Sequence, residues 1–527
     1  PFFKRCMRTS RPRSDESDFN YDNTLLKYYS DKKMDLIGAH SQLNFMNQSF
    51  SDIADQLFLE KLSNTQSAVQ NPKSRQPVHV VYGGANLFKS DTIQKLGKIA
   101  LRSIETYAPN FVEFADAMWL KGADTLPKFA DVIEDLEFRL ADNPEKVRAE
   151  NYDAWFAWTI YNRVIKKLQR EPVEDFRIDF EDGYGIRTDA EEDSHAVSAS
   201  NELAKMVNSA PVDNGLMASN DFAFTNGRAS EFIGFRIKSF QPETFKRAVR
   251  TLELFLTNFL AKTNNQLPEN FVVTLPKISQ TAEIEVLCEL LDEIEKRNNL
   301  PENSIKIEIM IETPQSVQLL SELAEAGKNR LNSAHFGAFD YTASFGITAV
   351  YQHLQHDACR FARQLMQINL APLGIRLSDS VTTEMPVPVH RGAELSDKQK
   401  AANKRAVHLA WRKHFNNVTA SFINGFYQSW DLHPNQLPAR YAAVYAFFVE
   451  SVDEQATRLK NFIGKAAQAM LTGNRFDDAA SAQGLLNFFI RAVRCGAMSE
   501  EEVRQKADLS SAELKSASFV KIMELRK

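Results

Sequence analysis

Short apolar runs typical of buried strands recur along the chain, and most are separated by segments with helical periodicity. Eight such runs are present, at residues 78–82, 176–180, 232–240, 271–278, 305–313, 333–340, 385–390 and 430–433. Strands that alternate with helices form a parallel sheet covered on both faces. Eight units predict an α/β fold of the (β/α)8 TIM-barrel type, whose reactive side chains gather at the carboxyl ends of the strands.

The barrel is expected at residues 76–440, and the remaining sequence forms additions to it. Residues 1–75 are polar and predict a partly helical N-terminal extension. A helical insertion is expected at about residues 109–172, after the first strand. Residues 441–527 show only helical patterning, which predicts a C-terminal cap or a segment that joins the subunits of a homo-oligomer.

Composition argues against several classes of protein. The apolar share of 43% and the charged share of 25% are ordinary for globular domains. A net charge of −5 gives no electrostatic basis for binding nucleic acid or an anionic membrane. No apolar run approaches the ~20 residues that span a bilayer. The four cysteines are far apart and form no CxxC motif, so we expect neither a zinc knuckle nor a disulfide framework.

The cysteines fit a reducing compartment, and we expect a cytoplasmic protein. Residues 1–14 carry five basic side chains and no acidic one. A disordered basic tail explains this stretch. The alternative is a transit remnant, which would place the protein in the mitochondrial matrix.

Two acidic residues, Glu312 and Asp340, each follow an apolar run that predicts a buried strand. Burying an unpaired charge costs several kcal/mol, so such carboxylates are rarely there for stability. Successive parallel strands would direct both into one crevice, where their hard oxygens suit Mg²⁺, or alternatively Mn²⁺. The alternative is a pair of helix-capping or salt-bridged acids, because Thr313 and Pro314 are typical of a helix start.

Other polar groups recur at the same ends of the predicted strands. Glu181 and Asp182 follow the second run, Arg236 lies within the third, and Lys277 follows the fourth. The guanidinium of Arg236 fits a substrate carboxylate or enolate oxygen, or a salt bridge to Glu181 or Asp182. Lys277 would neutralise a developing oxyanion, or would pair with Glu181 or Glu312.

Six short motifs occur in a characteristic order: DFEDG (179–183), FRIK (235–238), LPK (275–277), IMIET (309–313), GAFDYTASFG (337–346) and DLHPNQL (431–437). In this order and spacing, the chain resembles the citrate lyase β-subunit/HpcH-HpaI aldolase superfamily over about residues 77–445. Malate synthase is more distantly similar. The first strand departs from the pattern, because VYGGANLFK (81–89) lacks the proline and arginine of the superfamily's VPGxRPxRF-like segment.

The resemblance implies Mg²⁺ held by Glu312 and Asp340, with Glu181 and Asp182 bordering the same pocket. Arg236 would contact the carboxylate or carbonyl of the substrate, and Lys277 and Gly337 are further predicted substrate contacts. The chemistry implied is cleavage or formation of a C–C bond through a metal-stabilised enolate. The departure in the first strand leaves a CoA thioester substrate open.

The prediction is a Mg²⁺-dependent carbon–carbon lyase that acts on a small 2-oxo or hydroxy acid, with no nucleic-acid or membrane partner. A water held by Asp182 or Glu181 is expected to accept the substrate proton, and a carboxylate from another subunit is the alternative. Two other functions stay open. They are a malate synthase-like Claisen condensation with acyl-CoA, and a barrel without catalytic activity that serves as a scaffold.

Overall fold

The computed structural model describes residues 75–209, 230–464, 470–472, 475–477 and 479–526. The chain divides into two compact units, residues 1–67 and 68–527, and everything described belongs to the second. The predicted N-terminal extension therefore lies outside the described residues, apart from Arg75. No helix of the described part has both the length and the apolar character needed to cross a membrane.

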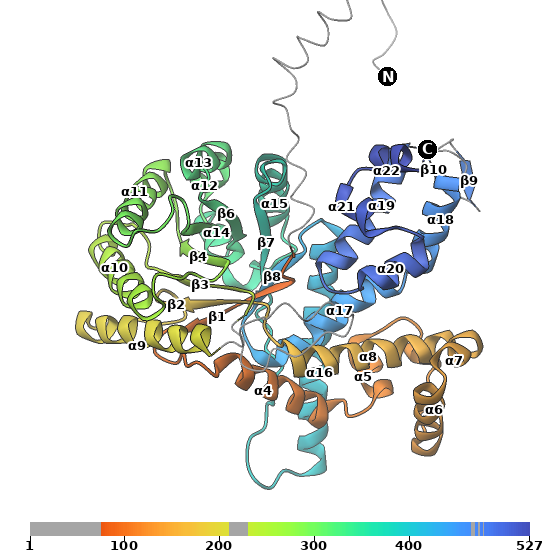
Figure 1. Cartoon of the computed structure of the whole chain (residues 1–527). Helices are drawn as coiled ribbons and strands as arrows, with labels where there is room; N and C mark the ends of the chain where they lie inside the picture. Colours follow the sequence, from red (N-terminus) through yellow and green to blue (C-terminus); the bar gives the residue numbers. More distant parts are fainter. Residues whose placement is uncertain (1–74, 210–229, 465–469, 473–474, 478, 527) are drawn as a thin grey trace, which may run out of the picture. The chain divides into compact units, whose positions relative to one another are not determined.

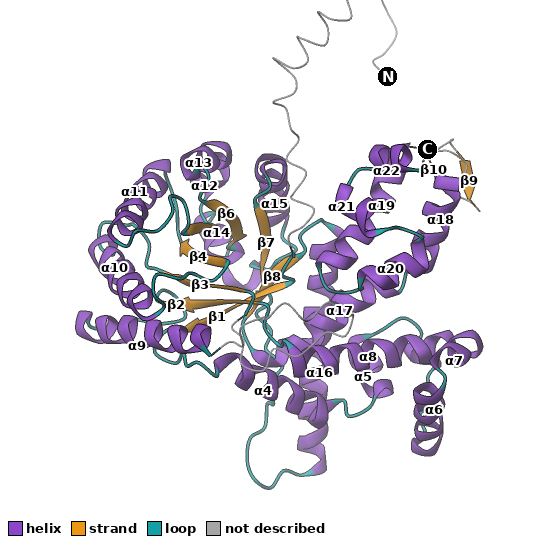
Figure 2. Ribbon diagram, in the orientation of Figure 1, coloured by secondary structure: helices purple, strands orange, loops and turns teal. Residues whose placement is uncertain are grey.

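Eight parallel strands close into a barrel in which each strand pairs with its neighbours along the chain and β8 pairs with β1 (Figure 1 and Figure 2). The predicted α/β fold of the (β/α)8 type is confirmed. The strands are β1 (His79–Gly84), β2 (Asp175–Asp179), β3 (Phe232–Arg236), β4 (Asn270–Leu275), β5 (Lys306–Ile311), β6 (Leu331–Phe336), β7 (Arg376–Val381) and β8 (Gln428–Asp431).

The seventh strand was predicted wrongly. It lies at Arg376–Val381 and not at residues 385–390. The segment RLSDSV reads as polar in sequence, yet five of its six residues are buried in the barrel wall. Residues 385–390 include Pro386 and Pro388, which have no N–H for a strand ladder, and they form a loop.

Helices cover the outside of the barrel, and in Figure 1 those from α9 to α15 form an arc around the strands. Their apolar faces pack on outward strand residues such as Phe235 and Ile307 in one continuous core. The helices between β2 and α16 are α9 (Asp189–Asn208), α10 (Phe245–Lys262), α11 (Thr281–Arg297), α12 (Pro314–Gln318), α13 (Leu320–Gly327), α14 (Ala338–Ser344) and α15 (Asp357–Leu370).

The segment between β1 and β2 is helical, in the region where an insertion is expected. It holds α4 (Thr92–Tyr107), α5 (Phe111–Met118), α6 (Ala130–Asp142), α7 (Pro144–Glu150) and α8 (Tyr152–Arg170). Asn151 ends α7 and caps α8, because its side chain accepts a hydrogen bond from the backbone N–H of Ala154.

Short 3₁₀ turns occur at Ala123–Thr125, Ala349–Tyr351, Ala371–Leu373 and Pro434–Gln436.

The C-terminal segment is mainly helical but also contains two short antiparallel strands, β9 (Met470–Thr472) and β10 (Arg475–Asp477), which the helical pattern did not predict. The helices from β7 to the end are α16 (Asp397–Ile423), α17 (Leu437–Val449), α18 (Val452–Gly464), α19 (Ala479–Arg494), α20 (Glu500–Ala507), α21 (Ser511–Ser516) and α22 (Phe519–Leu525). Almost every residue of α17 is buried, which makes this helix part of the core.

Candidate functional site

Polar side chains that follow five consecutive strands meet at the carboxyl-end mouth of the barrel. Glu181 follows β2, Arg236 ends β3, Lys277 follows β4, Glu312 follows β5 and Asp340 follows β6. Ion pairs and hydrogen bonds connect the first four of these residues. The barrel topology therefore assembles in one place the groups that the sequence scatters over 160 residues.

Arg236 is held by more partners than the sequence predicted. Its Nε and one terminal nitrogen donate to the two carboxylate oxygens of Asp179, each at 2.7 Å, in a bidentate pair. The other terminal nitrogen lies 3.2 Å from Glu181 Oε2, and the guanidinium lies 4.7 Å from the centre of the Tyr82 ring. Only 3% of Arg236 is exposed, so the direction in which it presents its positive charge is tightly constrained.

Asp179 is a residue of this site that the sequence prediction missed. It pairs directly with Arg236 across β2 and β3, and it is fully buried. It also accepts hydrogen bonds from the backbone N–H groups of Glu181 and Gly183, at 3.0 and 2.7 Å. A signal was available, because Arg177 and Asp179 alternate with apolar residues and so share the inward face of β2.

Lys277 connects three carboxylates. Its ammonium contacts Glu181 and lies 2.9 Å from Asp182 Oδ1, and its backbone N–H donates to Glu312 Oε2 at 2.9 Å. The φ of Lys277 is 54°, a left-handed conformation that costs a side-chain-bearing residue about 1–2 kcal/mol. The structure therefore shows the pairing alternative for this lysine, with Glu181 through its side chain and with Glu312 through its main chain, while its role toward a developing oxyanion stays a prediction.

Glu312 is a carboxylate with 2% exposure at the centre of the mouth. Burial, and then the nearby charge of Asp340, raise its pKa to about 8. A Cβ on Gly337 would lie 2.3 Å from Glu312 Cγ and 2.5 Å from its Oε1. Glycine at 337 therefore leaves the space that the Glu312 side chain occupies, while its predicted contact with substrate stays a prediction.

Asp340 lies in a helix and not in a strand. β6 ends at Phe336, and Asp340 is in the first turn of α14. The expected strand at residues 333–340 was too long because GAFDYTAS continues the apolar pattern into the helix. The carboxylate reaches solvent at the rim, and partial burial raises its pKa, an effect that Lys277 opposes.

Glu181 and Asp182 are adjacent acids at the mouth, and their pKa values are shifted in opposite directions. Burial and the neighbouring Asp182 raise the pKa of Glu181, although Arg236 and Lys277 oppose this effect. Burial also acts to raise the pKa of Asp182, but hydrogen bonds with Glu181 and Lys277 outweigh it, and the pKa is lowered. The shared surroundings therefore separate the pKa values of these two adjacent carboxylates.

A buried polar layer lies below Arg236 inside the barrel and is centred on Glu308. Glu308 accepts from Arg177 at 2.8 and 3.1 Å and lies 2.8 Å from His335 Nε2. The Tyr82 hydroxyl contacts His335 Nδ1 at 3.0 Å, and its ring stacks on Trp430. These contacts fix the ring that faces the Arg236 guanidinium, so the layer supports the mouth from below.

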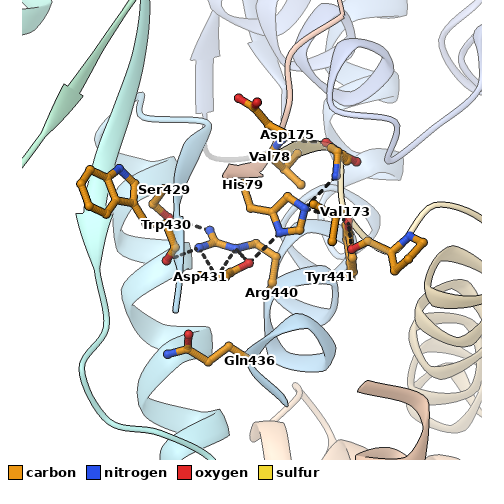
Figure 3. A network of polar contacts seen from close by, with 12 residues as sticks. Val78, His79, Val173, Asp175, Ser429, Trp430, Asp431, Gln436, Arg440 and Tyr441 are labelled. Atoms are coloured by element: carbon orange, nitrogen blue, oxygen red, sulfur yellow. Dashed lines mark hydrogen bonds and ion pairs between the residues drawn. The ribbon is translucent and has the colours of Figure 1, made fainter. Parts of the chain in front are cut away.

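A second buried network closes the seam between β8 and β1 (Figure 3). Asp431 at the end of β8 accepts from His79 Nδ1 at 2.7 Å and from Arg440 of α17 at 2.7 Å, and its Oδ1 lies 2.8 Å from His414 Nε2. Arg440 also donates to Ser429 at 2.6 Å. With these partners, the pKa of Asp431 lies well below its ordinary value despite burial. The network ties α16 and α17 to the seam.

Within the described residues, no group of three or more His, Cys, Asp or Glu side chains is arranged to hold a metal ion. Glu312 and Asp340 offer hard carboxylate oxygens, which Mg²⁺ combines with water and substrate oxygens in proteins. The charge of Asp340 raises the pKa of Glu312, so a cation bound by the pair would remove a repulsion. The donor set therefore fits a divalent cation with two protein ligands.

A family model matches residues 64–522, which is most of the chain. The chain belongs to the family DUF6986, a domain of unknown function. A comparison with curated proteins found no match.

Among solved structures, the chain is similar to a citrate lyase from Burkholderia xenovorans, with 17% identity, a TM-score of 0.45, and coverage of 68% of this chain and 92% of the other. Another is CitE from Mycobacterium tuberculosis in complex with magnesium, acetoacetate and coenzyme A, with 16% identity, a TM-score of 0.40 and coverage of 62% and 91%. A Haloferax volcanii malate synthase matches with 14% identity, a TM-score of 0.36 and coverage of 67% and 88%. These are the kinds of protein that the motifs resemble.

Proposed function

We propose that this protein is a Mg²⁺-dependent carbon–carbon lyase, which cleaves or forms a C–C bond in a 2-oxo or hydroxy acid through an enolate. The observation that carries the proposal is the buried Glu312 carboxylate beside Asp340, within the same polar cluster as the Arg236 guanidinium. Stability alone does not account for this arrangement, because a carboxylate with a pKa of about 8 destabilises the folded chain at neutral pH.

Glu312 and Asp340 are the proposed ligands of the ion. A divalent cation supplies positive charge beside the oxygen that becomes an enolate, an effect worth several kcal/mol. Glycine at position 337 leaves room for the Glu312 side chain. A hydrogen bond from the backbone N–H of Lys277 orients Glu312 Oε2. The chain thus fixes one ligand by packing and leaves the other on the accessible rim.

Arg236 is the proposed partner of the substrate carboxylate or carbonyl oxygen. Asp179 occupies two of its nitrogens, so the edge that carries the third nitrogen, near Glu181, is the part that faces the mouth. A fixed guanidinium stabilises charge without a cost of reorganisation as the bond breaks. Lys277 would restrain Glu181 and Asp182, which it contacts directly.

Glu181 is the proposed group that accepts and returns the proton, directly or through a water. Burial and Asp182 raise its pKa, although Arg236 and Lys277 oppose this effect, and a raised pKa makes a carboxylate a stronger base. Asp182 is more exposed and has a lowered pKa, which suits a group that stays ionised and positions water or substrate.

The test is an assay of the purified chain on a panel of 2-oxo and hydroxy acids, with product detected by mass spectrometry in Mg²⁺ and in EDTA. We expect Mg²⁺-dependent turnover of at least one acid. Calorimetric titration of Mg²⁺ with pyruvate or oxaloacetate accompanies the assay. Absence of turnover across the panel together with absence of metal-linked heat would show that the barrel is a scaffold and would overturn the proposal.

A further inference from the structure

A small apolar cluster lies inside the barrel, apart from the main core. It is formed by four buried side chains and two partly buried rings that pack against them, which are Val80, Met310, Val381, Trp430, Tyr82 and Phe339. On β5, Met310 lies between Ile309 and Ile311, which belong to the outer core. Because side chains alternate along a strand, Met310 faces the inside of the barrel.

This cluster reaches the groups of the candidate site. One terminal nitrogen of Arg236 lies 3.5 Å from Met310 Sδ, and the guanidinium lies 4.7 Å from the centre of the Tyr82 ring. Phe339 directly precedes Asp340 in the first turn of α14, and its ring is partly exposed. The apolar cluster therefore borders the place where the proposed metal ligands and Arg236 meet.

Two rings of the cluster form a fixed flat surface. Tyr82 and Trp430 are stacked, with ring centres 4.7 Å apart and planes inclined by 30°. The Tyr82 hydroxyl contacts His335 Nδ1 at 3.0 Å, which holds the ring in its orientation. Figure 3 shows the Trp430 indole extending away from the Asp431 network of the seam. Rings that are already fixed can bind an apolar group without a further loss of side-chain freedom.

The indole N–H of Trp430 points to a bound molecule as well. The side chain is 9% exposed, and Nε1 has no hydrogen-bond acceptor among the described residues. An indole N–H can only donate, and a buried donor that stays unpaired is costly. An uncharged oxygen of a ligand, such as the hydroxyl of a hydroxy acid, would supply the acceptor.

The charges at the mouth decide what kind of group suits this surface. The six side chains of the cluster are uncharged, and the neighbouring cations are engaged elsewhere. Arg236 pairs with Asp179, and Lys277 pairs with Glu181 and Asp182. A second carboxylate packed on the rings would lose water without gaining a partner, whereas an apolar group would gain from burial.

We propose that the substrate is a 2-oxo or hydroxy acid whose remaining part is an uncharged ring or branched apolar chain, which packs on Tyr82, Phe339 and Trp430. The inference rests on the proposed function, because that function places the acid group of the substrate at the metal ligands and Arg236. It narrows the substrate class, since acids that end in a second carboxylate fit this surface poorly.

The test is calorimetric titration of the whole chain, in Mg²⁺ and in EDTA, with three acids that share one 2-oxo head: 2-oxobutanoate, 2-oxoglutarate and 4-phenyl-2-oxobutanoate. We expect the phenyl compound to bind about tenfold more tightly than 2-oxobutanoate in Mg²⁺, and 2-oxoglutarate to bind no more tightly. A phenyl compound no tighter than 2-oxobutanoate, or a tighter 2-oxoglutarate, would overturn this inference and leave the lyase standing. Absence of Mg²⁺-dependent binding by all three acids would overturn the proposed function and this inference with it.

Matched variants show where the ring binds. Phe339→Ala removes a ring from the cluster, and Phe361→Ala is the control, because Phe361 lies on α15 outside the barrel and is 59% exposed. The affinity ratio of the phenyl compound to 2-oxobutanoate should fall about tenfold in the first variant and stay unchanged in the second. Phe339→Leu keeps an apolar side chain and should restore most of the ratio. An unchanged ratio in Phe339→Ala, with thermal unfolding like that of wild type, would contradict the inference.

Discussion

The barrel contains two buried charge networks that differ in how well their acids are compensated. At the β8–β1 seam, Arg440, His79 and His414 surround Asp431, and its pKa lies well below the ordinary value. At the carboxyl-end mouth, burial and then the like charge of Asp340 outweigh the opposing charges of Arg236 and Lys277, and the pKa of Glu312 rises to about 8. The barrel thus contains one buried acid whose charge is well compensated, Asp431, and one whose charge is poorly compensated, Glu312.

This difference in charge compensation distinguishes a network that stabilises the fold from one that we propose binds a ligand. A satisfied buried ion pair resists removal of either partner, because the other charge is left uncompensated. An unsatisfied carboxylate at the open end of a barrel lowers stability and is retained where a ligand completes it. We therefore assign the seam to stability and the mouth to binding and chemistry.

The largest expected effect is on turnover. Asp340→Asn removes one proposed ligand of the ion, and we expect Mg²⁺-dependent turnover to fall about 10³-fold or more, since metal stabilisation of an enolate is worth several kcal/mol. The free energy of unfolding without metal should stay unchanged or rise. The check is steady-state kinetics together with chemical denaturation, and wild-type kinetics in this variant would contradict the assignment of the mouth.

Substitution of the central acid of the seam should lower the stability of the fold. Asp431→Asn leaves Arg440 buried without its carboxylate, and we expect a loss of about 3–5 kcal/mol of stability. Urea denaturation followed by circular dichroism measures this loss. A variant as stable as wild type would show that the seam is no more critical to the fold than the surface.

The pH dependence of stability sharpens the contrast. The pKa of Glu312 is raised from 4.5 to about 8, so its favourable contribution is fully present below pH 4.5 and is lost as pH rises through 8. Glu312→Gln should therefore stabilise the metal-free chain above pH 8 by about 2–4 kcal/mol relative to wild type. Denaturation at pH 5, 7 and 9 tests this, and a pH-independent difference between the two proteins would refute it.

The smallest effect concerns the space beside Glu312. Gly337→Ala puts a Cβ 2.3 Å from Glu312 Cγ, so the acid must move, at an expected cost of about 1–3 kcal/mol. Mg²⁺ affinity should fall with it, while Gly484→Ala, at an exposed position of α19 with no neighbour within 4 Å, is the control. Unchanged Mg²⁺ binding in Gly337→Ala would mean that Glu312 does not need its present position.

Much of this architecture could be predicted from the pattern of strands and helices. The closed barrel and seven of the eight strand positions follow from apolar runs, because inward and outward residues of those strands are mostly buried. β7 escaped prediction because its Ser and Asp residues are buried through hydrogen bonds, such as those of Asp379 to Arg363 and Ser421, and not through apolar packing.

The site was predictable in its residue types but not in its pairings. Sequence order places Glu181, Arg236 and Lys277 at strand ends, and the structure brings them together. The bidentate partner Asp179 and the stacked Tyr82 depend on strand register, which apolar runs alone do not specify. The turn into α14 that carries Asp340 depends on where β6 stops, and the continuing apolar pattern conceals that point.

The most direct test of the central claim is a crystal soaked with Mn²⁺ and pyruvate and measured at the manganese absorption edge. We expect one anomalous peak between the carboxylates of Glu312 and Asp340, with Arg236 on the pyruvate carboxylate. Carboxylates that point apart, or a peak elsewhere in a fully soaked crystal, would contradict it.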